Sequence, residues 1–412
     1  MQIEKNDQLR QYFINHLPEY FELLRQLVNI NSFTTNPSGV NLVGERTAKA
    51  FEPLGFQCEA IQPFDAKYGK HIFLTHQGRS NQKIALISHL DTVFSLQEEI
   101  ENEFNWRVED DRIYGPGTVD IKGGTVMIFM VLEGLKEYFP DVFEQITWLV
   151  AADATEEVLS NEFSHFLLER LDNSTLACLV FEGGTPLAGK YALVVARKGK
   201  ANFQVRVEGR SAHAGNRHGQ GANAIVQIAH TVQQIAALTD YDQQLTFNVG
   251  TLHGGSVVNR VPHYAEAEVE MRTYSSDVLE QGIANILALN GISQVSSQDG
   301  FPCKVEICLV QQNDPWPRNP QTDQLYDLWK SKGADLGLRI IPEERGGLSD
   351  GNMLWLAHPT LDGLGPVGNN AHCSERSADG SKEQEYVLKS SFIPKALLNT
   401  LAIVNLAKAA LA

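Results

Sequence analysis

Three short runs of apolar residues constrain the fold of this 412-residue chain more than any other feature. The runs, at 83–88, 146–152 and 176–181, lack the polar alternation of a strand with one solvated face. Such runs are typical of strands that are buried on both faces, as in a parallel sheet. A helical pattern at 121–138 separates the first two runs, and strand–helix alternation predicts an α/β fold.

A different pattern begins after Arg197. Residues 201–208 and 264–272 alternate apolar and polar side chains strictly, which predicts strands with one solvated face. Helical periodicity at 222–238 and 276–289 and further strands at 245–252 and 304–311 give the order strand, helix, strand, strand, helix, strand. That order is typical of the ferredoxin-like α+β arrangement.

Helical and α/β patterning resumes at Thr322. The small domain is therefore expected to be an insertion at 197–316. It would interrupt a larger domain whose first part is 1–196 and whose second part is 317–412.

The charge balance restricts the partners of the protein. The net charge is −16, from 50 acidic and 34 basic residues, which argues against nucleic acid and anionic membranes as partners. The longest mostly apolar run, 126–132, is far shorter than the roughly 20 residues of a membrane-spanning helix. The N-terminus has neither the basic start nor the apolar block of a secretory signal, so we expect a cytoplasmic protein.

The five cysteines are expected to be reduced thiols, because their number is odd and no C-x-x-C pair occurs. Cys303 and Cys308 as metal ligands are an alternative. No second pair is present to complete a tetrahedral site with them.

Polar side chains gather where the three apolar runs end. His89 and Asp91 follow the first run, Glu156 and Glu157 follow the second, and Glu182 ends the third. In an open α/β sheet, ligands bind beyond the carboxyl ends of the strands. These five side chains are therefore expected to converge on one site.

Asp120 and His372 are candidates to join this group. Asp120 lies in a glycine-rich turn that leads into the predicted helix, and His372 has only His358 as a competing histidine after the inserted domain. Imidazole and carboxylate ligands suit Zn²⁺, Mn²⁺ or Co²⁺. Three carboxylates exceed what one hydrolytic zinc ion usually takes, which favours a dinuclear site with a bridging carboxylate. Glu156, if left over, could then act as a general base.

Each candidate also has an ordinary structural interpretation. His89 and Asp91 could form a hydrogen-bonded pair in the core, and Asp120 could cap the following helix. The pair Glu156–Glu157 could be solvated acids in the first turn of a helix, and Glu182 an exposed loop acid. The expected convergence at one sheet edge favours the metal site over these interpretations.

Three motifs follow one another along the chain: Ser88-His-Leu-Asp91-Thr-Val, then Gly115-Pro-Gly-Thr-Val-Asp120-Ile-Lys-Gly-Gly124, then the pair Glu156–Glu157. Together they resemble the co-catalytic zinc peptidases, the family of glutamate carboxypeptidase, acetylornithine deacetylase, succinyl-diaminopimelate desuccinylase and aminoacylase. The resemblance covers nearly the whole chain and is closest to glutamate carboxypeptidase. It implies an α/β catalytic domain with a mixed, mainly parallel sheet between helices, and an inserted ferredoxin-like α+β lid or dimerisation domain.

The resemblance also implies roles at single positions. One Zn²⁺ would be bound by His89, Asp120 and Glu182, and the other by Asp120, Glu157 and His372, so that Asp120 bridges. Asp91 would hold the ring of His89. Glu156 would be the general base and then the proton donor to the leaving amine. The peptide bond Asp120–Ile121 would be cis.

Further matches concern substrate and partner. In Gly209-Arg-Ser-Ala-His213-Ala-Gly215, the His would reach the active site of a partner subunit and polarise the scissile carbonyl, so a homodimer through the lid is expected. Asn259 would contact substrate, and a substrate carboxylate would be held by Arg272 and the loop with Gly347, Ser349 and Asp350. His213 could instead bond its own loop, and Arg272 could form a surface salt bridge with a neighbouring Glu.

Three features depart from the family pattern. Val158-Leu159-Ser160 follows the Glu pair where Gly-Ser is usual, Cys373-Ser-Glu-Arg376 follows His372 in place of Ser-Pro-Asn-Glu, and Glu270 stands where Asp is frequent. None of these changes removes an implied ligand, so activity is expected.

The expected function is that of a dinuclear zinc hydrolase, with Mn²⁺ or Co²⁺ as substitutes. It would cleave the amide bond of a small peptide or N-acyl amino acid with a free carboxylate and release a C-terminal acidic amino acid. The alternatives are an N-acyl amino acid deacylase, similar to acetylornithine deacetylase or aminoacylase, and a non-catalytic metal-binding relative. Retention of Glu156 argues against the last, because a pure binder needs no general base.

Overall fold

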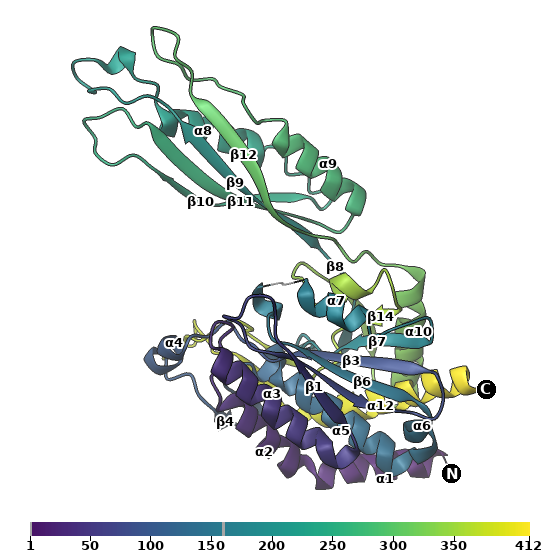
Figure 1. The fold of residues 1–412 in the computed structure, drawn as a ribbon. Coiled ribbons are helices and arrows are strands. Elements are labelled where there is room, and N and C mark those ends of the chain that lie inside the picture. Colours follow the sequence, from purple (N-terminus) through teal and green to yellow (C-terminus); the bar gives the residue numbers. More distant parts are fainter. Residues whose placement is uncertain (1, 159–160) are drawn as a thin grey trace. The chain divides into compact units, whose positions relative to one another are not determined.

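The structure is a computed structural model that describes residues 2–158 and 161–412. It divides into two compact units (Figure 1). The first comprises the residues up to Val195, Arg318–Glu344 and Ser349–Ala412, and the second comprises Ala196–Pro317 and Arg345–Leu348. The expected boundaries after 196 and after 316 each lie within one residue of this division.

The segment Arg345–Leu348 departs from the expected arrangement, because the sequence places it in the larger domain whereas it belongs to the second unit. The backbone N–H of Lys198 donates to the carbonyl of Arg345 at 3.0 Å. Arg272 Nη1 donates to the carbonyl of Gly346 at 2.7 Å. These bonds attach the segment to a unit from which it is distant in sequence.

A six-stranded sheet organises the first unit. Its order is β1-β2-β6-β3-β7-β14, in which β6, β3, β7 and β14 are parallel and β1 and β2 are antiparallel to their neighbours. The strands are β1 (Gln57–Ile61), β2 (His71–His76), β3 (Lys83–His89), β6 (Thr147–Asp153), β7 (Thr175–Val180) and β14 (Thr360–Leu361). The sheet is mixed and mainly parallel, and its three central strands are the three predicted buried runs.

Helices cover both faces of this sheet (Figure 1). Ile84 and Leu86 of β3 belong to the core on one face, whereas Ala85 and Ile87 belong to the core on the other. The first face packs against α1 (Gln2–Asn15), α2 (Leu17–Val28), α3 (Pro37–Phe51), α5 (Gly123–Tyr138), α10 (Pro320–Asp335) and α12 (Phe392–Leu411). The second face packs against α7 (Glu162–Leu168) and α11 (Gly351–Leu354). This double coverage explains the lack of polar alternation in the strands.

The first helical stretch differs from the sequence expectation. Apolar residues recur at three- and four-residue steps over 7–30, which predicts one helix there. The structure has two helices instead, α1 and α2, separated at His16. Pro18 lies in the first turn of α2, where its missing N–H removes no helical hydrogen bond. A continuous helix would instead lose a backbone bond at this proline, so the chain breaks there.

The last helix, α12, is long and apolar enough to cross a membrane by length and composition, but 72% of its most apolar window is buried inside the structure. Its side chains, including Leu397, Leu398 and Ile403, lie in the main core of the first unit. Burial of this kind is that of a central core helix, because the apolar surface is already covered by protein.

Shorter elements complete the first unit. They are η1 (Glu52–Leu54), α4 (Leu96–Glu101), α6 (Pro140–Gln145), η5 (Lys389–Ser391) and a small sheet of β15 (Gly368–Asn369), β16 (Tyr386–Leu388), β5 (Arg112–Tyr114) and β4 (Arg107–Glu109). The paired strands β8 (Tyr191–Arg197) and β13 (Ile340–Arg345) begin in the first unit and end in the second. In the small sheet, β16 pairs with β5 and so joins a C-terminal segment to the stretch just before Asp120.

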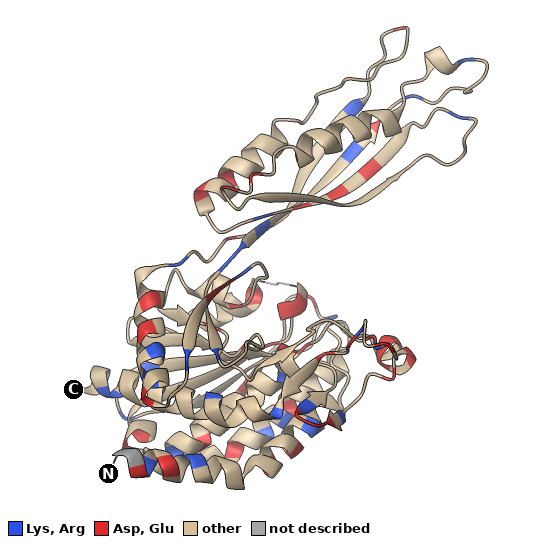
Figure 2. Ribbon diagram, turned by 180° about the vertical axis from the view of Figure 1, so that it is seen from behind, with Lys and Arg blue, Asp and Glu red and all other residues tan. Residues whose placement is uncertain are grey.

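The second unit has the predicted element order. It contains β9 (Gly199–Glu208), η4 (His218–Gln220), α8 (Ala224–Ala236), β10 (Thr246–Gly254), β11 (Tyr264–Thr273), α9 (Ser276–Leu287) and β12 (Lys304–Asn313). The sheet order is β10-β11-β9-β12 with all pairs antiparallel, and both helices pack against it. Charged residues of both signs lie along its strands (Figure 2). The structure therefore confirms the predicted α/β domain with an inserted ferredoxin-like domain.

Candidate metal centre

The carboxyl ends of three adjacent strands bring most of the candidate residues together. His89 is the last residue of β3, Glu182 follows β7, and Glu156 and Glu157 lie in the short helix η3 (Glu156–Val158) after β6. Because β6, β3 and β7 are neighbouring parallel strands, these ends meet at one edge of the sheet.

Asp120 is placed by an irregular turn, η2 (Thr118–Lys122), that leads into α5. Asp120 and Ile121 have non-helical backbone angles, and the peptide bond between them is cis, as the resemblance implied. Gly124, at the start of α5, lies so close to the end of β7 that a Cβ atom would meet the carbonyl oxygen of Phe181 at 2.1 Å. Only glycine permits this approach, which brings the Asp120 turn beside Glu182.

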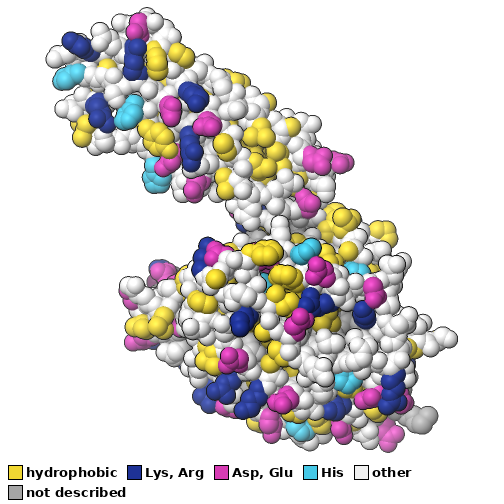
Figure 3. Space-filling model, in the orientation of Figure 1, with side chains coloured by type: hydrophobic (Ala, Val, Ile, Leu, Met, Phe, Trp, Pro, Cys, Tyr) yellow, Lys and Arg dark blue, Asp and Glu magenta, His cyan; other side chains and the backbone are white. Residues whose placement is uncertain are grey.

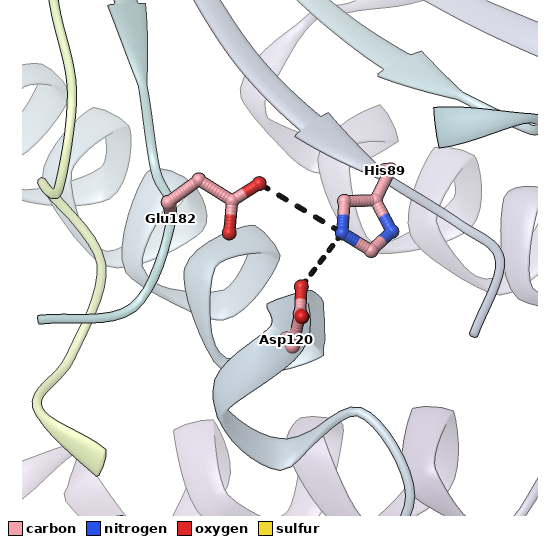
Figure 4. A group of neighbouring side chains, drawn as sticks. All are labelled: His89, Asp120 and Glu182. Atoms are coloured by element: carbon pink, nitrogen blue, oxygen red, sulfur yellow. Dashed lines mark hydrogen bonds and ion pairs between the residues drawn. The ribbon is translucent and has the colours of Figure 1, made fainter. Parts of the chain in front are cut away.

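The first group of candidate ligands is His89, Asp120 and Glu182 (Figure 4). His89 Nε2 lies 2.9 Å from Asp120 Oδ1 and 3.8 Å from Glu182 Oε1. One ligand atom of each residue lies within 4.8 Å of the others. Distances of this size leave room for a cation between the atoms, which would bind all three.

The second group is Asp120, Glu157 and His372. His372 Nε2 lies 3.2 Å from Asp120 Oδ2 and 3.1 Å from Glu157 Oε2. The two oxygens of Asp120 therefore face different groups, Oδ1 toward His89 and Oδ2 toward His372. Among the residues that the structure describes, no other three His, Cys, Asp or Glu side chains bring their ligand atoms within 4.8 Å of one another.

The electrostatics of the two groups fit a cation. Hydrogen bonds with Asp120 and Glu157 raise the pKa of His372 to about 11, against the opposing effect of burial. Burial, followed by the charge of Asp120, raises the pKa of Glu157 to about 7. Glu157 Oε1 is buried and has no hydrogen-bond partner within the described part of the chain. Carboxylates that are crowded and buried in this way repel one another, and divalent cations would relieve the repulsion.

Glu156 lies beside these groups and belongs to neither. Its side chain is buried, and burial raises the pKa of Glu156 well above its usual value. His89 opposes this rise, while Glu157 and Glu182 add to it. A carboxyl with a raised pKa next to a metal site is suited to accept and return a proton.

Asp91 lies beside the ring of His89, as the resemblance implied, and has further partners. His89 Nδ1 lies 2.9 Å from the backbone carbonyl oxygen of Asp91 and 3.6 Å from Asp91 Oδ1, so the carbonyl is the closer partner of the ring. The carboxylate accepts hydrogen bonds from Thr34 Oγ1 at 2.8 Å and from the backbone N–H groups of Glu156 and Glu157 at 3.3 Å each. Asp91 therefore orders the turn that carries the Glu pair as well as lying next to His89.

His213 and Asn259 lie in the second unit and next to each other. The backbone N–H of Ala214 donates to the carbonyl of Asn259 at 3.0 Å, and His213 forms a β-bridge with Arg260. The exposed His213 accepts the backbone N–H groups of Gly215 and Asn216 at Nδ1, each at 3.1 Å. These bonds place the proton of a neutral ring on Nε2, so His213 both bonds its own loop and keeps a donor.

Arg272 forms the salt bridge that the sequence left open as an alternative. Its Nε and Nη2 donate to the two oxygens of Glu270 at 2.6 Å and 3.0 Å, and its Nη1 donates to Gly346. Arg197 Nη1 donates to the carbonyls of Gly347 and Leu348 at 3.1 Å and 3.0 Å. Two arginines thus hold three successive carbonyls of the glycine-rich loop.

Ser349 and Asp350 follow this loop and lie in the first unit. Ser349 is fully buried, and its hydroxyl donates to Asp362 at 2.9 Å. Asp350 is also buried, and burial, reinforced by Asp153, raises the pKa of its carboxyl well above the usual value. The side chain of Ser349 is therefore engaged in holding the loop rather than exposed to a ligand.

The cysteines are not part of the candidate metal centre. All five cysteines are free thiols, and neither ligand group contains Cys303 or Cys308. Leu159 and Ser160, where the chain departs from the family after the Glu pair, lie outside the described residues.

An α/β unit whose strand ends carry two groups of imidazole and carboxylate side chains has the kind of candidate site that metal-dependent hydrolases use. Residues 195–290 match the family model of the peptidase dimerisation domain of the M20 peptidases. Carboxypeptidase G2 of a Pseudomonas species is 27% identical over 400 residues, which are 96% of this chain and 90% of that protein. Acetylornithine deacetylase of Erwinia tasmaniensis is 26% identical over 274 residues, or 62% of this chain and 68% of that protein.

Solved structures share the fold. A tripeptidase from Staphylococcus aureus superposes with a TM-score of 0.75 at 20% identity, covering 95% of this chain and 99% of that one. An M20 family metallo-carboxypeptidase from Sulfolobus solfataricus gives a TM-score of 0.69 at 13% identity, covering 94% and 99%. The domain match and the relatives in sequence show that the chain is similar to M20 peptidases, and these relatives are a carboxypeptidase and a deacetylase. The resemblance seen in the motifs is thereby confirmed.

Proposed function

We propose that this protein is a two-metal amide hydrolase that removes a C-terminal amino acid from a small peptide or N-acyl compound. The observation that carries the proposal is the orientation of Asp120, whose two oxygens face two different groups of ligands. A carboxylate in this position bridges a pair of cations in dinuclear sites.

The proposed ligands are those of the two groups. His89, Asp120 and Glu182 would hold one ion, and Asp120, Glu157 and His372 the other. The set contains imidazole and carboxylate and no thiolate, which suits Zn²⁺ and also Mn²⁺ or Co²⁺. When bound, such ions supply Lewis acidity and lower the pKa of water.

The proton transfers are assigned to Glu156. Its carboxylate takes a proton from the attacking water as the bond from the water oxygen to the carbonyl carbon forms. It returns that proton to the nitrogen as the C–N bond breaks, so that an amine and a carboxylic acid leave. Asp91 keeps this base in place, because its carboxylate accepts the backbone N–H groups of Glu156 and Glu157. His213 of the partner subunit is the proposed additional donor to the scissile carbonyl, through Nε2.

Positive charge in the second unit supports a substrate with acidic groups. Arg272 of β11 is the register partner of Lys200 on β9, and burial together with the charge of Arg272 lowers the pKa of Lys198. Three cations therefore lie close together in a chain whose net charge is −16. Such a cluster favours a substrate that brings carboxylates, and an arginine suits bidentate binding of one of them.

A carboxylate substrate would have to compete with Glu270 for Arg272, since the Glu270 side chain occupies two of the three guanidinium nitrogens. Asn259 and the loop at Gly347 remain proposed substrate contacts. The length of the match to carboxypeptidase G2 also favours the carboxypeptidase assignment over deacylation of an N-acyl amino acid.

We also propose a homodimer through the second unit. Residues 195–290 match a dimerisation domain, and β10 is an edge strand of its sheet. Leu252, Val257 and Val258, on β10 and the loop after it, are 45%, 57% and 102% exposed, and hydrophobic side chains are visible on this unit in Figure 3. Exposed apolar residues beside an unpaired strand edge are typical of an association surface. Sedimentation showing only monomer at working concentration would contradict this.

The substrate proposal is tested with a panel of peptides and N-acyl amino acids, assayed with Zn²⁺, Mn²⁺ or Co²⁺ supplied. We expect release of a C-terminal Glu or Asp at a kcat/KM at least about tenfold above that for matched Gln or Asn substrates, because the cationic cluster favours the added carboxylate. Preference for acetylated amino acids irrespective of side-chain charge would favour the deacylase alternative. No cleavage of any panel member with any of the metals would contradict hydrolase function.

A further inference from the structure

Glu385 is a fully buried acid that no step of the proposed reaction uses. It stands immediately before β16, after the chain has made an excursion over 374–384 beyond His372. Its backbone N–H donates to the carbonyl of Cys373 at 2.8 Å, and its own carbonyl accepts the backbone N–H of Gly115 at 3.4 Å. The main chain of Glu385 thus connects the neighbour of one candidate ligand to the glycine-rich turn of another.

The side chain of Glu385 reaches the same turn. Its Oε1 accepts the backbone N–H of Val119 at 2.8 Å and that of Asp120 at 3.2 Å. Asp120 and Ile121 are non-helical, so the carboxylate replaces the partners that a regular helix would provide at this point. Its Oε2 is buried without a hydrogen-bond partner in the described part of the chain.

We propose that Glu385 is a positioning residue that sets Asp120 relative to His372 and thereby determines how tightly the second metal is held. This inference rests on the proposed two-metal function. It names a residue outside the ligand set that acts through Asp120, in the way that hydrogen-bond partners of ligands orient them in other metal sites.

The two groups of ligands depend on Glu385 to different degrees. In the first group, His89 and Glu182 are fixed by the adjacent strands β3 and β7. Asp120, which belongs to both groups, accepts its position from the Glu385 carboxylate through its backbone N–H. In the second group a further ligand, His372, lies in a loop rather than at a strand end, and the neighbouring carbonyl of Cys373 accepts the backbone N–H of Glu385. Loss of the carboxylate should therefore weaken the second metal more than the first.

Two substitutions distinguish the effect of the hydrogen bonds of the Glu385 side chain from the effects of its charge and its volume. Glu385→Met fills a similar volume but has no acceptor for the N–H groups of Val119 and Asp120. Glu385→Gln keeps an acceptor oxygen and removes the charge. Glu375→Ala is the matched control, because Glu375 is an exposed acid on the same excursion that pairs with Lys382 and not with the Asp120 turn.

The experiment is a titration of each metal-free, folded variant with Co²⁺, followed by visible absorption and by calorimetry. We expect wild type and Glu375→Ala to bind two equivalents. Glu385→Met should bind the second equivalent about 10–100-fold more weakly and the first with a smaller loss. Glu385→Gln should recover at least half of the loss on a logarithmic scale, and circular dichroism of each metal-free variant shows whether it is folded.

The outcomes decide between positioning and a purely structural role. Equal weakening of both equivalents in Glu385→Met, or none, overturns the proposal, as does a Gln variant that loses the second metal as strongly as the Met variant. If Glu385→Met does not fold, a loss of more than tenfold in Glu385→Gln still overturns it. Failure of the two-metal function itself would be visible separately, as fewer than two equivalents in wild type.

Discussion

The charge state of His372 in the metal-free protein gives a sharp test of the second ligand group. Its Nε2 lies 3.1 Å from Glu157 Oε2 and 3.2 Å from Asp120 Oδ2, and these hydrogen bonds raise the pKa of His372 to about 11. The perturbation is Glu157→Gln, which removes one of the two carboxylates. A single charge pair at 3.1 Å contributes about 5 kcal/mol at an effective dielectric constant of about 20.

The imidazole is 54% exposed, so solvent screening reduces this interaction. With this screening, the interaction between His372 and Glu157 contributes about 2 kcal/mol, which corresponds to a decrease of about 1.5 in the pKa of His372 when Glu157 is replaced. The sign for the metal-free fold follows from linkage. A histidine whose pKa is raised by folding stabilises the protein fully below its unfolded pKa of about 6.5, and this contribution is lost as the pH rises through about 11.

The assay is an NMR titration of the imidazole signals of metal-free protein between pH 6 and about 11, over which an unperturbed histidine would lose its proton. The chain has 12 histidines, and the spectrum of His372→Asn assigns the signal. We expect a wild-type midpoint above pH 10, a Glu157→Gln midpoint lower by about 1.5, and a smaller change in Glu156→Gln, since the ion pairs of His372 are with Asp120 and Glu157. A wild-type midpoint near 6.5, or one that Glu157→Gln leaves unchanged, would refute the proposed contacts.

Three further expectations follow from the same structure. Chelation should lower the free energy of unfolding of the first unit by about 2.7 kcal/mol per site, if the metal had been present at 100 times its Kd. In calorimetry the unfolding temperature of the first unit should fall, while the transition of the second unit stays unchanged. Glu156→Gln should keep its metal content in mass spectrometry and lose about 10²–10⁴ in kcat, whereas a loss of less than tenfold would remove Glu156 from the base role. Trp329→Phe should destabilise the first unit by about 1–3 kcal/mol in urea unfolding, because it leaves buried Asn399 Oδ1 without the indole N–H that donates to it at 2.9 Å; an unchanged midpoint would show that this bond contributes nothing.

The fold was predictable where the sequence pattern reflects burial directly. The runs that became β3, β6 and β7 lack alternation because helices cover both faces of the sheet. The strict alternation of β9 and β11 likewise reflects one core face and one solvated face. The prediction of a single helix over 7–30 was wrong at His16, because the apolar periodicity continues across a helix break that Pro18 causes.

The site was predictable to the extent that strand ends bring distant residues together. His89, Glu156, Glu157 and Glu182 converge because three parallel strands end at the same edge. Contacts that depend on irregular segments gave no signal in the sequence. Glu385 stands in an acidic and polar stretch like many others, and only the return of the chain to the Asp120 turn makes it a partner of the backbone there.

The same limit applies to the loop at 345–348 and to Arg272. The sequence indicated an arginine on the wet face of a strand, but the bidentate bond to Glu270 and the bond to Gly346 require knowledge of the register and of a segment more than 70 residues away. The role of the Asp91 carboxylate is a similar case, because its partners include Thr34 and the amides of the Glu pair.

Metal stoichiometry in three proteins tests the central claim, a two-metal site bridged by Asp120, most directly. Wild type, His372→Ala and Asp120→Ala are stripped of metal, dialysed against Zn²⁺ and measured by mass spectrometry. The geometry predicts two ions in wild type, one in His372→Ala and none bound at wild-type affinity in Asp120→Ala, since only Asp120 belongs to both groups. An Asp120→Ala protein that keeps one ion as tightly as wild type would contradict the bridging role.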